Sequence, residues 1–481
     1  GPDGTSFGAP VTLTLRYNQS EIPEGVDEST LVMLGTDHDT GELVPIAGAT
    51  VDPDANSITG TIAGFSVFGM ALPGCTFEGG PLPWCPPRCQ PPAPTFEDDP
   101  GGEIDTSFGT DGKLSFEIGI PSSTGVSDLL IDDEDRLVLG VSALRMAVIR
   151  VLPDGEGLDT SFGDEGVALV FTQSVDSVAI SIALRTDGRI LLHGVEQPPG
   201  GGLDLKLVRF MPDGTFDPSF GDDGIVLILA DETHWGQGRV ATLPDGGVLV
   251  TEAVTRTIQQ FLPDGSADTA FGTDGVATDP AFAATPVVRR ATADWLLGVG
   301  SGVQIVDADG APGMFYSNGG QRGVSGAIIE VPGGRYVMAG RTAALIGDPV
   351  DVWAARIQPG DESGSFEAEL CFGASGAGVY DFGGSEAGVD AAVQSDDRIL
   401  IAGHTNDRGD DDDLFVVRIK PDGELDEGFG DNGIVYIDFG GDESGGAIAI
   451  DDQGRIVVAG SSAVGDPIQG ENYAVIARLL P

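Results

Sequence analysis

The chain has 481 residues, and its 41% hydrophobic content is enough for a sizeable core and two or three domains. Its 76 acidic residues outnumber 24 basic ones, giving a net charge of −52, and its only lysines are Lys113, Lys206 and Lys420. Such a charge repels nucleic acid and anionic lipid, so a nucleic-acid partner is excluded. A high-salt habitat, calcium-binding acidic turns or a genomic bias toward arginine would each explain the charge.

The sequence contains no apolar run of about 18 residues, so we expect no transmembrane segment. The first two residues, Gly1-Pro2, are typical of a cleaved tag. We therefore expect the chain to be a piece of a larger surface protein.

Residues 1–72 are predicted to form a small β-sandwich. Hydrophobic and polar residues alternate in Val11–Leu15 and in Ser57–Ile62, as they do in half-buried strands. Ile22–Val26 and Gly64–Leu72 are together similar to a β-sandwich module found beside repeats in bacterial surface proteins. The resemblance implies a structural spacer.

Residues 73–102 are predicted to be an extended linker, because Pro, Gly and Cys dominate their composition. Cys75, Cys85 and Cys89 lie within it. A zinc knuckle is disfavoured because the linker has no histidine and the cysteine spacing is unusual for zinc. We expect one disulfide, joining Cys75 to Cys85 or Cys89, and the odd count leaves the pairing open.

Residues 103–481 carry a repeat of four short apolar runs, in which the third run ends in Arg-x-x-Pro-Asp-Gly and a Phe-Gly-x-Asp-Gly turn leads to the fourth. A degenerate copy, Phe315–Gly320, fills the one double-length gap and makes seven units. Four strands per unit at this period predict a seven-bladed β-propeller. The other copies of Phe-Gly are at 108–109, 162–163, 220–221, 271–272, 372–373 and 429–430.

This pattern, with Leu-Asp-x-x-Phe-Gly between the two Asp-Gly turns, resembles the delta-60 repeat of large bacterial surface and secreted proteins. The match covers Glu103–Pro481. The resemblance implies a repeat architecture and an exported protein, extracellular or on the bacterial cell surface. It implies no activity, because the family is defined by its repeat.

The order of the runs predicts how the ring closes. Small side chains crowd the first run of each unit, which should be the innermost strand. The domain opens with a lone fourth-type run, Lys113–Ile118, and ends on a third-type run, Tyr473–Leu479. These two runs should pair and complete the last blade, which removes an open sheet edge.

The longest loops should share one face of the propeller. They are Glu196–Leu203, Arg341–Asp351, His404–Asp413 and Ser461–Asn472, and each joins a second strand to a third. Because strands alternate in direction, these loops should lie on the face opposite the repetitive Asp-Gly turns. Variable loops of this kind are where binding is expected.

The loop His404–Asp413 differs from the rest of the repeat. Asp407, Arg408, Gly409 and Asp410 include an Arg-Gly-Asp tripeptide, a candidate binding site for adhesion, and Asp410, Asp411, Asp412 and Asp413 are candidate calcium ligands. The alternative is a solvated loop, which we favour because Gly and Asp are abundant in this chain.

The recurring turn aspartates are expected to cap their own turns, with calcium binding as the alternative. The repeated Leu and Phe of Leu-Asp-x-x-Phe-Gly should pack between blades as plugs. The histidines are scattered over different units and do not repeat, which disfavours an enzyme. The turn aspartates are Asp111, Asp164, Asp222, Asp274 and Asp431, and the histidines are His38, His193, His234 and His404.

Two functional classes therefore remain. The first is a non-catalytic scaffold whose propeller binds an extracellular or cell-surface protein or glycan. The alternative is a polysaccharide hydrolase or lyase that uses carboxylates at the axial channel. The lack of a unit-specific His, Tyr or Arg cluster favours the scaffold, and calcium is the only cofactor under consideration.

Overall fold

The computed structural model divides into two compact units, Gly1–Thr95 and Phe96–Pro481. It describes residues 6–16, 32–36, 43–45, 49–52, 57–64, 68–71 and 100–481, with gaps at 120–124, 144, 171–175, 233–237, 254, 279–286, 290–293, 300–301, 318–322, 343–348, 360–365, 370–371, 374–375, 406–410 and 465–470.

The described strands of the first unit form two antiparallel sheets, in the orders β1-β5-β4 and β3-β2-β6. Thr14 and Thr59 oppose each other across β1 and β5, and their hydroxyl oxygens are 2.9 Å apart. The all-β character agrees with the sequence, while the sandwich remains a prediction. The strands are β1 (Ser6–Arg16), β2 (Val32–Thr36), β3 (Leu43–Pro45), β4 (Thr50–Asp52), β5 (Ser57–Gly64) and β6 (Phe68–Ala71).

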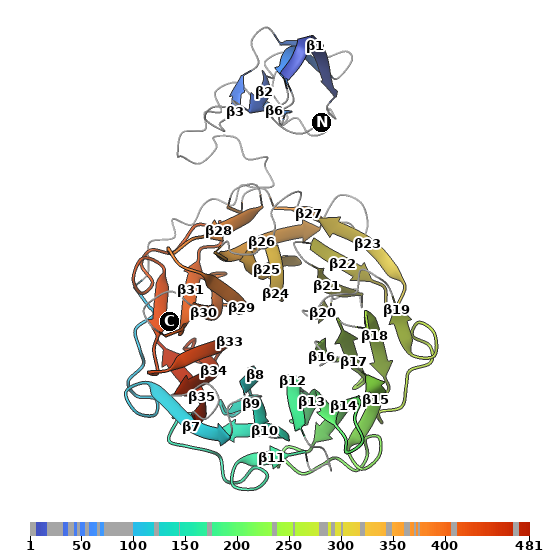
Figure 1. The fold of residues 1–481 in the computed structure, drawn as a ribbon, viewed down its shortest axis with the longest axis vertical. Coiled ribbons are helices and arrows are strands. Elements are labelled where there is room, and N and C mark those ends of the chain that lie inside the picture. Colours follow the sequence, from blue (N-terminus) through green and yellow to red (C-terminus); the bar gives the residue numbers. More distant parts are fainter. Residues whose placement is uncertain are drawn as a thin grey trace. The chain divides into compact units, whose positions relative to one another are not determined.

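The second unit is a β-propeller of seven antiparallel sheets arranged in a ring (Figure 1). Among the described residues, no helix is long and apolar enough to cross a membrane. Blades one to three are β8 (Gly125–Ile131), β9 (Leu137–Ala143), β10 (Arg145–Val151) and β11 (Val167–Leu169); β12 (Asp176–Leu184), β13 (Ile190–Gln197), β14 (Leu203–Phe210) and β15 (Ile225–Glu232); and β16 (Gly238–Thr242), β17 (Val248–Glu252), β18 (Thr257–Phe261) and β19 (Val276–Thr278).

Blades four to six continue the ring, and blade five has a fifth strand because β27 and β28 both pair with β26. Their strands are β20 (Val287–Arg289), β21 (Trp295–Val299), β22 (Gly302–Val306) and β23 (Pro312–Ser317); β24 (Gly323–Val331), β25 (Arg335–Thr342), β26 (Val352–Pro359), β27 (Phe366–Ala368) and β28 (Ala377–Tyr380); and β29 (Glu386–Val393), β30 (Ile399–Thr405), β31 (Asp413–Ile419) and β32 (Ile434–Ile437).

Blade seven joins the two ends of the domain, as predicted. It consists of β33 (Asp442–Ile450), β34 (Ile456–Val464), β35 (Glu471–Leu479) and, as its outermost strand, β7 (Lys113–Gly119). Leu114 is the register partner of Ile476. The first strand of each blade lies nearest the axis (Figure 1), and runs such as Ala447–Ile450 are rich in small residues because the blades converge there.

Seven hydrophobic clusters of the described residues are each shared by two neighbouring blades, and an eighth, smaller cluster lies within blade two. The repeated phenylalanines are buried in these clusters, which confirms their prediction as plugs between blades. Burying one such side chain contributes about 1.5–3 kcal/mol. The plugs, each at most 1% exposed, are Phe108, Phe162, Phe220, Phe271, Phe372 and Phe429.

The polar residues that recur from unit to unit form a latch between blades. Arg209 donates from Nε to Asp217 at 2.8 Å, lies over the Phe220 ring at 4.2 Å and donates from Nη1 to the Pro263 carbonyl of the next blade at 2.6 Å. Gly221 N also donates to Asp264 O of that blade, at 2.8 Å. The arginine, phenylalanine and Pro-Asp-Gly turn are therefore structural parts. Corresponding arginines are Arg150, Arg356, Arg418 and Arg478.

The antiparallel order within blades creates two different faces. The turn face carries the links between first and second strands, such as Arg185–Arg189, and between third and fourth strands, such as Met211–Gly224. The loop face carries the links between second and third strands, such as Pro198–Gly202, and those between blades, such as Asp381–Ser385.

The fourth blade differs from the predicted repeat. Phe315 and Tyr316 belong to the outermost strand β23, which begins at Pro312, only two residues after Gly310. This blade therefore has no room for a Phe-Gly turn between its third and fourth strands. The degenerate copy preserves the strand but loses the latch segment.

Candidate functional site

The candidate site lies on the loop face. On the turn face, the repeated polar groups already form the hydrogen bonds of the latches between blades. All four predicted long loops start and end at described strands, and each joins a second strand to a third, so all four leave from the same face. The strand ends are Gln197 and Leu203, Thr342 and Val352, Thr405 and Asp413, and Val464 and Glu471.

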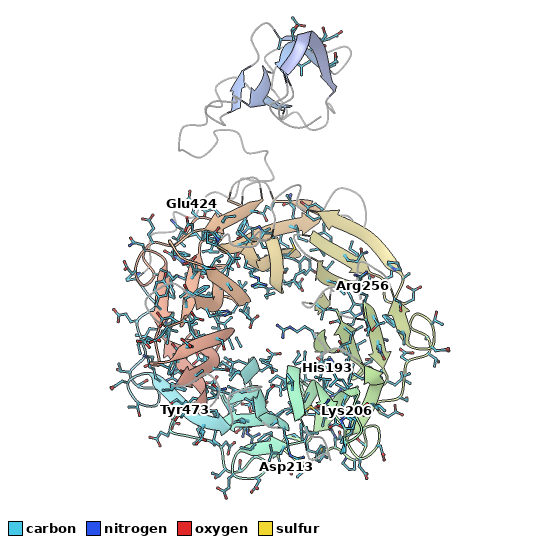
Figure 2. The ribbon with its side chains drawn as sticks, in the orientation of Figure 1. His193, Lys206, Asp213, Arg256, Glu424 and Tyr473 are labelled. Atoms are coloured by element: carbon cyan, nitrogen blue, oxygen red, sulfur yellow. The ribbon has the colours of Figure 1, made fainter. Side chains whose placement is uncertain are left out.

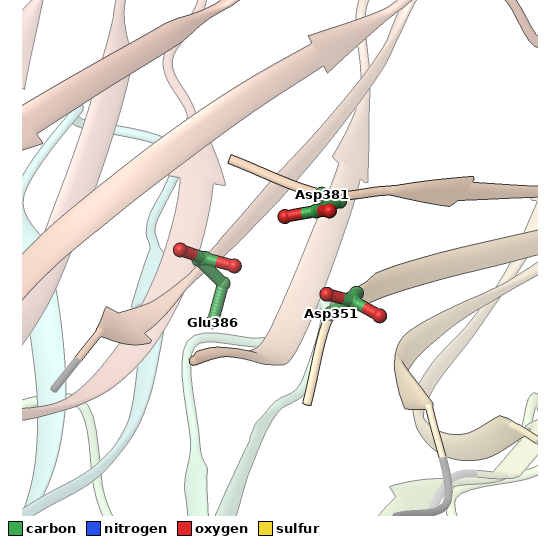
Figure 3. Close-up of side chains that lie close together, drawn as sticks. All are labelled: Asp351, Asp381 and Glu386. Carbon is green, nitrogen blue, oxygen red and sulfur yellow. The ribbon is translucent and has the colours of Figure 1, made fainter. Parts of the chain in front are cut away.

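Asp351, Asp381 and Glu386 meet where blades five and six adjoin at this face. Asp351 precedes β26, Asp381 follows β28, and Glu386 begins β29. One carboxylate oxygen from each lies within 4.8 Å of the other two. Figure 3 shows the three carboxylates directed toward one another.

Asp413, Asp438 and Glu443 form the same arrangement between blades six and seven, and their oxygens also lie within 4.8 Å of one another. Both groups contain Asp-Phe-Gly-Gly-x-Glu, at Asp381–Glu386 and at Asp438–Glu443. The first aspartate accepts from the glycine two residues on, at 2.7 Å in one group and 2.5 Å in the other. One loop conformation therefore positions the carboxylates at both junctions.

These carboxyls crowd one another. Burial raises the pKa of Glu386, and the charges of Asp351 and Asp381 raise it further, although the backbone amides of Phe382 and Gly384 oppose the change. Burial and Asp381 likewise raise the pKa of Asp351. Burial raises the pKa of Glu443 to about 6, although the Ser462 hydroxyl and two backbone amides oppose the change.

The predicted site residues fall partly within this arrangement. Of the four predicted calcium ligands, Asp413 belongs to the second group, whereas Asp411 and Asp412 precede it without joining it. Asp407, Arg408, Gly409 and Asp410 lie outside the described residues, as do Cys75, Cys85 and Cys89.

The five turn aspartates lie on the opposite face and belong to neither group. Asp222, for example, exchanges backbone hydrogen bonds with Ile225 inside its own turn. Side-chain capping and calcium binding at these positions both stay predictions.

Carboxylates also lie on the innermost strands, where the hydrolase alternative requires them. Asp128 accepts from the Ile182 amide of the next blade at 3.1 Å, and Asp390 accepts from the Ile448 amide of its next blade at 3.1 Å. Burial raises the pKa of Asp390 to about 6, against the opposing charge of Arg239. Both carboxylates therefore bridge adjacent inner strands.

His193 is the one buried histidine of the described residues that pairs with a carboxylate. Its Nδ1 donates to the Lys206 carbonyl at 3.0 Å, and its Nε2 contacts Glu252. Both side chains are at most 1% exposed. His193 and Lys206 lie together within blade two (Figure 2). The buried pair of His193 and Glu252 therefore belongs to the core and has no access to a ligand.

Sequence reasoning missed Asp351, Asp381, Glu386, Asp438 and Glu443. The available signal was the hexapeptide Asp-Phe-Gly-Gly-x-Glu, which occurs twice and 57 residues apart, at 381 and 438. The acidic group is not visible as a compact ligand motif in the sequence. One carboxylate comes from the start of a third strand, one from the loop after the fourth strand, and one from the first strand of the next blade.

Residues 185–220 and 394–429 match the family described as "Domain of unknown function (DUF5122) beta-propeller". The matches span parts of blades two and six and agree with the observed fold. By sequence, the chain matches no curated protein.

Several solved structures are similar at low identity. An α-L-arabinanase of Penicillium chrysogenum is 13% identical with a TM-score of 0.39, and the match covers 76% of this chain and 98% of that one. A gluconolactonase of Xanthomonas campestris is 13% identical with a TM-score of 0.33, covering 80% and 95%. A virginiamycin B lyase of Staphylococcus aureus is 10% identical with a TM-score of 0.39, covering 76% and 99%. Such likeness says nothing about activity.

Proposed function

We propose that the propeller is a non-catalytic scaffold of an extracellular or cell-surface protein and that its loop face binds a protein or a glycan. The observation that carries this proposal is the difference between the two faces. Polar groups on the turn face hold the blades together, whereas the loop face carries long connections that differ from blade to blade. Residues of the loops are not needed for the packing of one blade on the next, so they can vary and form contacts with a binding partner.

The alternative function, a carboxylate-based polysaccharide hydrolase or lyase, receives less support. Its acid and base would have to be available to substrate near the axis. Asp128 and Asp390 instead accept backbone hydrogen bonds between inner strands. This use favours a structural role for both carboxylates.

Replacing the loops tests the scaffold proposal. Residues 343–350 and 465–470 would each be replaced with a short Gly-Asn turn, and binding to a glycan panel and to bacterial surface extract would be measured. We expect binding to fall in these variants. A matched control replaces Arg185–Arg189, on the turn face, with a turn of equal length and should preserve binding.

Two outcomes would contradict the proposal. Unchanged binding in both loop variants would show that the loop face is not the binding surface. Release of reducing sugar or unsaturated product from polysaccharides, abolished by Asp128→Asn or Asp390→Asn, would instead establish the enzyme.

A further inference from the structure

We propose that the two acidic groups of the loop face are calcium sites, each of which joins two neighbouring blades. The first site consists of Asp351, Asp381 and Glu386, and the second of Asp413, Asp438 and Glu443. This inference goes beyond the proposed function and does not depend on what the loop face binds.

The spacing of the carboxylate oxygens fits one shared ion. Calcium binds oxygen at about 2.4 Å, so two oxygens on one ion lie at most about 4.8 Å apart. In each group the three oxygens lie within 4.8 Å of one another. A set made only of carboxylate oxygens selects a hard divalent cation, and calcium tolerates irregular geometry completed by water.

The first site also contains a buried oxygen that lacks a partner. Glu386 is only 2% exposed; the backbone amides of Phe382 and Gly384 act on its carboxyl, but its Oε2 is buried without a hydrogen bond within the described residues. Thr405 stands opposite Glu386 in the register of β29 and β30, and its buried hydroxyl lacks a partner in the same described region. Unsatisfied buried oxygens are costly, and a cation beside Glu386 removes this cost.

Charge supports the same assignment. Within the described part of the chain, none of Asp351, Asp381 and Glu386 forms an ion pair, although three carboxylates converge there. The second site differs, because Lys113 Nζ donates to the Asp438 carbonyl at 2.5 Å and Ser462 donates to Glu443 at 2.7 Å. We therefore expect the first site to bind calcium more tightly.

The same backbone contact supports both sites. Glu386 N donates to Val350 O at 2.7 Å, and Glu443 N donates to Asp412 O at 2.8 Å. In each case the accepting carbonyl directly precedes the aspartate at the start of the third strand, Asp351 or Asp413. The donating amide belongs to the first strand of the next blade. An ion at each site strengthens this junction at the loop face, where the arginine latches do not reach.

Calcium binding to the whole chain tests the proposal by isothermal titration and by counting bound ions after equilibrium dialysis. We expect two bound calcium ions in the wild type. Asp351→Asn or Glu386→Gln should lose the tighter ion, Glu443→Gln the weaker one, and the double variant Glu386→Gln with Glu443→Gln both.

Asp204→Asn is the matched control. Asp204 stands five residues before Arg209, as Asp351 does before Arg356 and Asp413 before Arg418, but it belongs to neither acidic group. This variant should keep both ions. In EDTA, Glu386→Gln should unfold at or above the wild-type midpoint because it removes one of three like charges, so lost binding would not reflect misfolding.

Several results would overturn the assignment. The first is a wild type that binds no calcium at millimolar concentration. This result would mean that protonation, and not a cation, removes the charge of the crowded carboxylates. Others are a double variant that retains both ions, a control that loses one, or sites that take magnesium in preference to calcium. None of these measurements uses the ligand of the loop face, so their failure is distinct from failure of the proposed function.

Discussion

Arg478 donates a hydrogen bond from Nε to Asp105, 373 positions away in the chain, at 2.7 Å. The same guanidinium reaches Pro153 O at 2.6 Å and lies 4.8 Å from the centre of the Phe108 ring. The other latch arginines each pair with a carboxylate 8 to 13 residues later in the chain. In blade seven the start of the domain supplies the carboxylate and the plug, so one latch closes the ring.

Arg478→Leu should therefore open the ring, whereas Arg209→Leu should weaken only an internal junction. Arg478→Leu removes the arginine that is paired with the buried Asp105, which costs about 3–5 kcal/mol, whereas Asp217 in Arg209→Leu keeps Arg189 Nε at 2.9 Å and should lose less. Limited proteolysis should cut Arg478→Leu between residues 100 and 120, since β7 would detach and leave β35 as an open edge. Identical cleavage patterns in the two variants would contradict this account of closure.

Stability should fall in acid through the latch carboxylates. Burial opposes ionisation of Asp217, but the Ser219 hydrogen bonds and Arg209 lower its pKa to about 2 from 3.8. A lowered folded-state pKa contributes stability above the unfolded pKa, and this contribution is lost as the pH falls from about 4 toward 2.

The contribution of Asp217 is about 2 kcal/mol at neutral pH. Denaturant titrations should show Asp217→Asn less stable than the wild type at pH 7, with the difference shrinking toward pH 2. Asp222→Asn, in the neighbouring exposed turn, is the control and should change little. A difference that stays constant with pH would rule out this linkage.

Gly214 approaches the preceding blade closely. A Cβ there would lie 2.6 Å from Gly163 N, and its φ is +83°. Gly201 has a similar φ of +86° with nothing within 4 Å of its Cβ position. Gly214→Ala and Gly201→Ala therefore share the backbone strain, and only the first forces two blades apart.

We expect Gly214→Ala to be less stable than Gly201→Ala by about 1–3 kcal/mol, the usual cost of overpacking. Thermal unfolding of both variants measures the difference. Equal midpoints would mean that the Pro-Asp-Gly turn can move away from the Phe-Gly turn at no cost.

The net charge of −52 should make stability depend on salt. Like charges repel over a Debye length of about 10 Å at 0.1 M salt and about 3 Å at 1 M, so added salt should relieve the repulsion. The unfolding midpoint should rise with NaCl. KCl should raise it equally, because screening does not depend on the ion, and a midpoint indifferent to both salts would refute the self-repulsion argument.

The sequence by itself determined the seven-bladed ring and its closure. A plug phenylalanine, a latch arginine and a Pro-Asp-Gly turn recur in most units because each junction between blades poses the same packing problem. The offset between Lys113–Ile118 and Tyr473–Leu479 determined which strands pair, since an open edge is unfavourable. The fourth blade was counted correctly from Phe315–Gly320, but its lack of a Phe-Gly turn was not predicted, because its outermost strand is present without the latch segment that defines the motif.

Only the tertiary structure decided where the carboxylates meet. Asp351 and Glu386 are 35 positions apart and belong to different blades, so their proximity depends on how two sheets pack and on where Asp-Phe-Gly-Gly-x-Glu turns between them. The aspartate run at 410–413 drew attention in sequence because it is dense. Asp413 joins an acidic group because the adjacent Leu414 is the register partner of Ile437, which precedes Asp438, and because Glu443 N donates to Asp412 O. Density along the chain carries no information about these pairings.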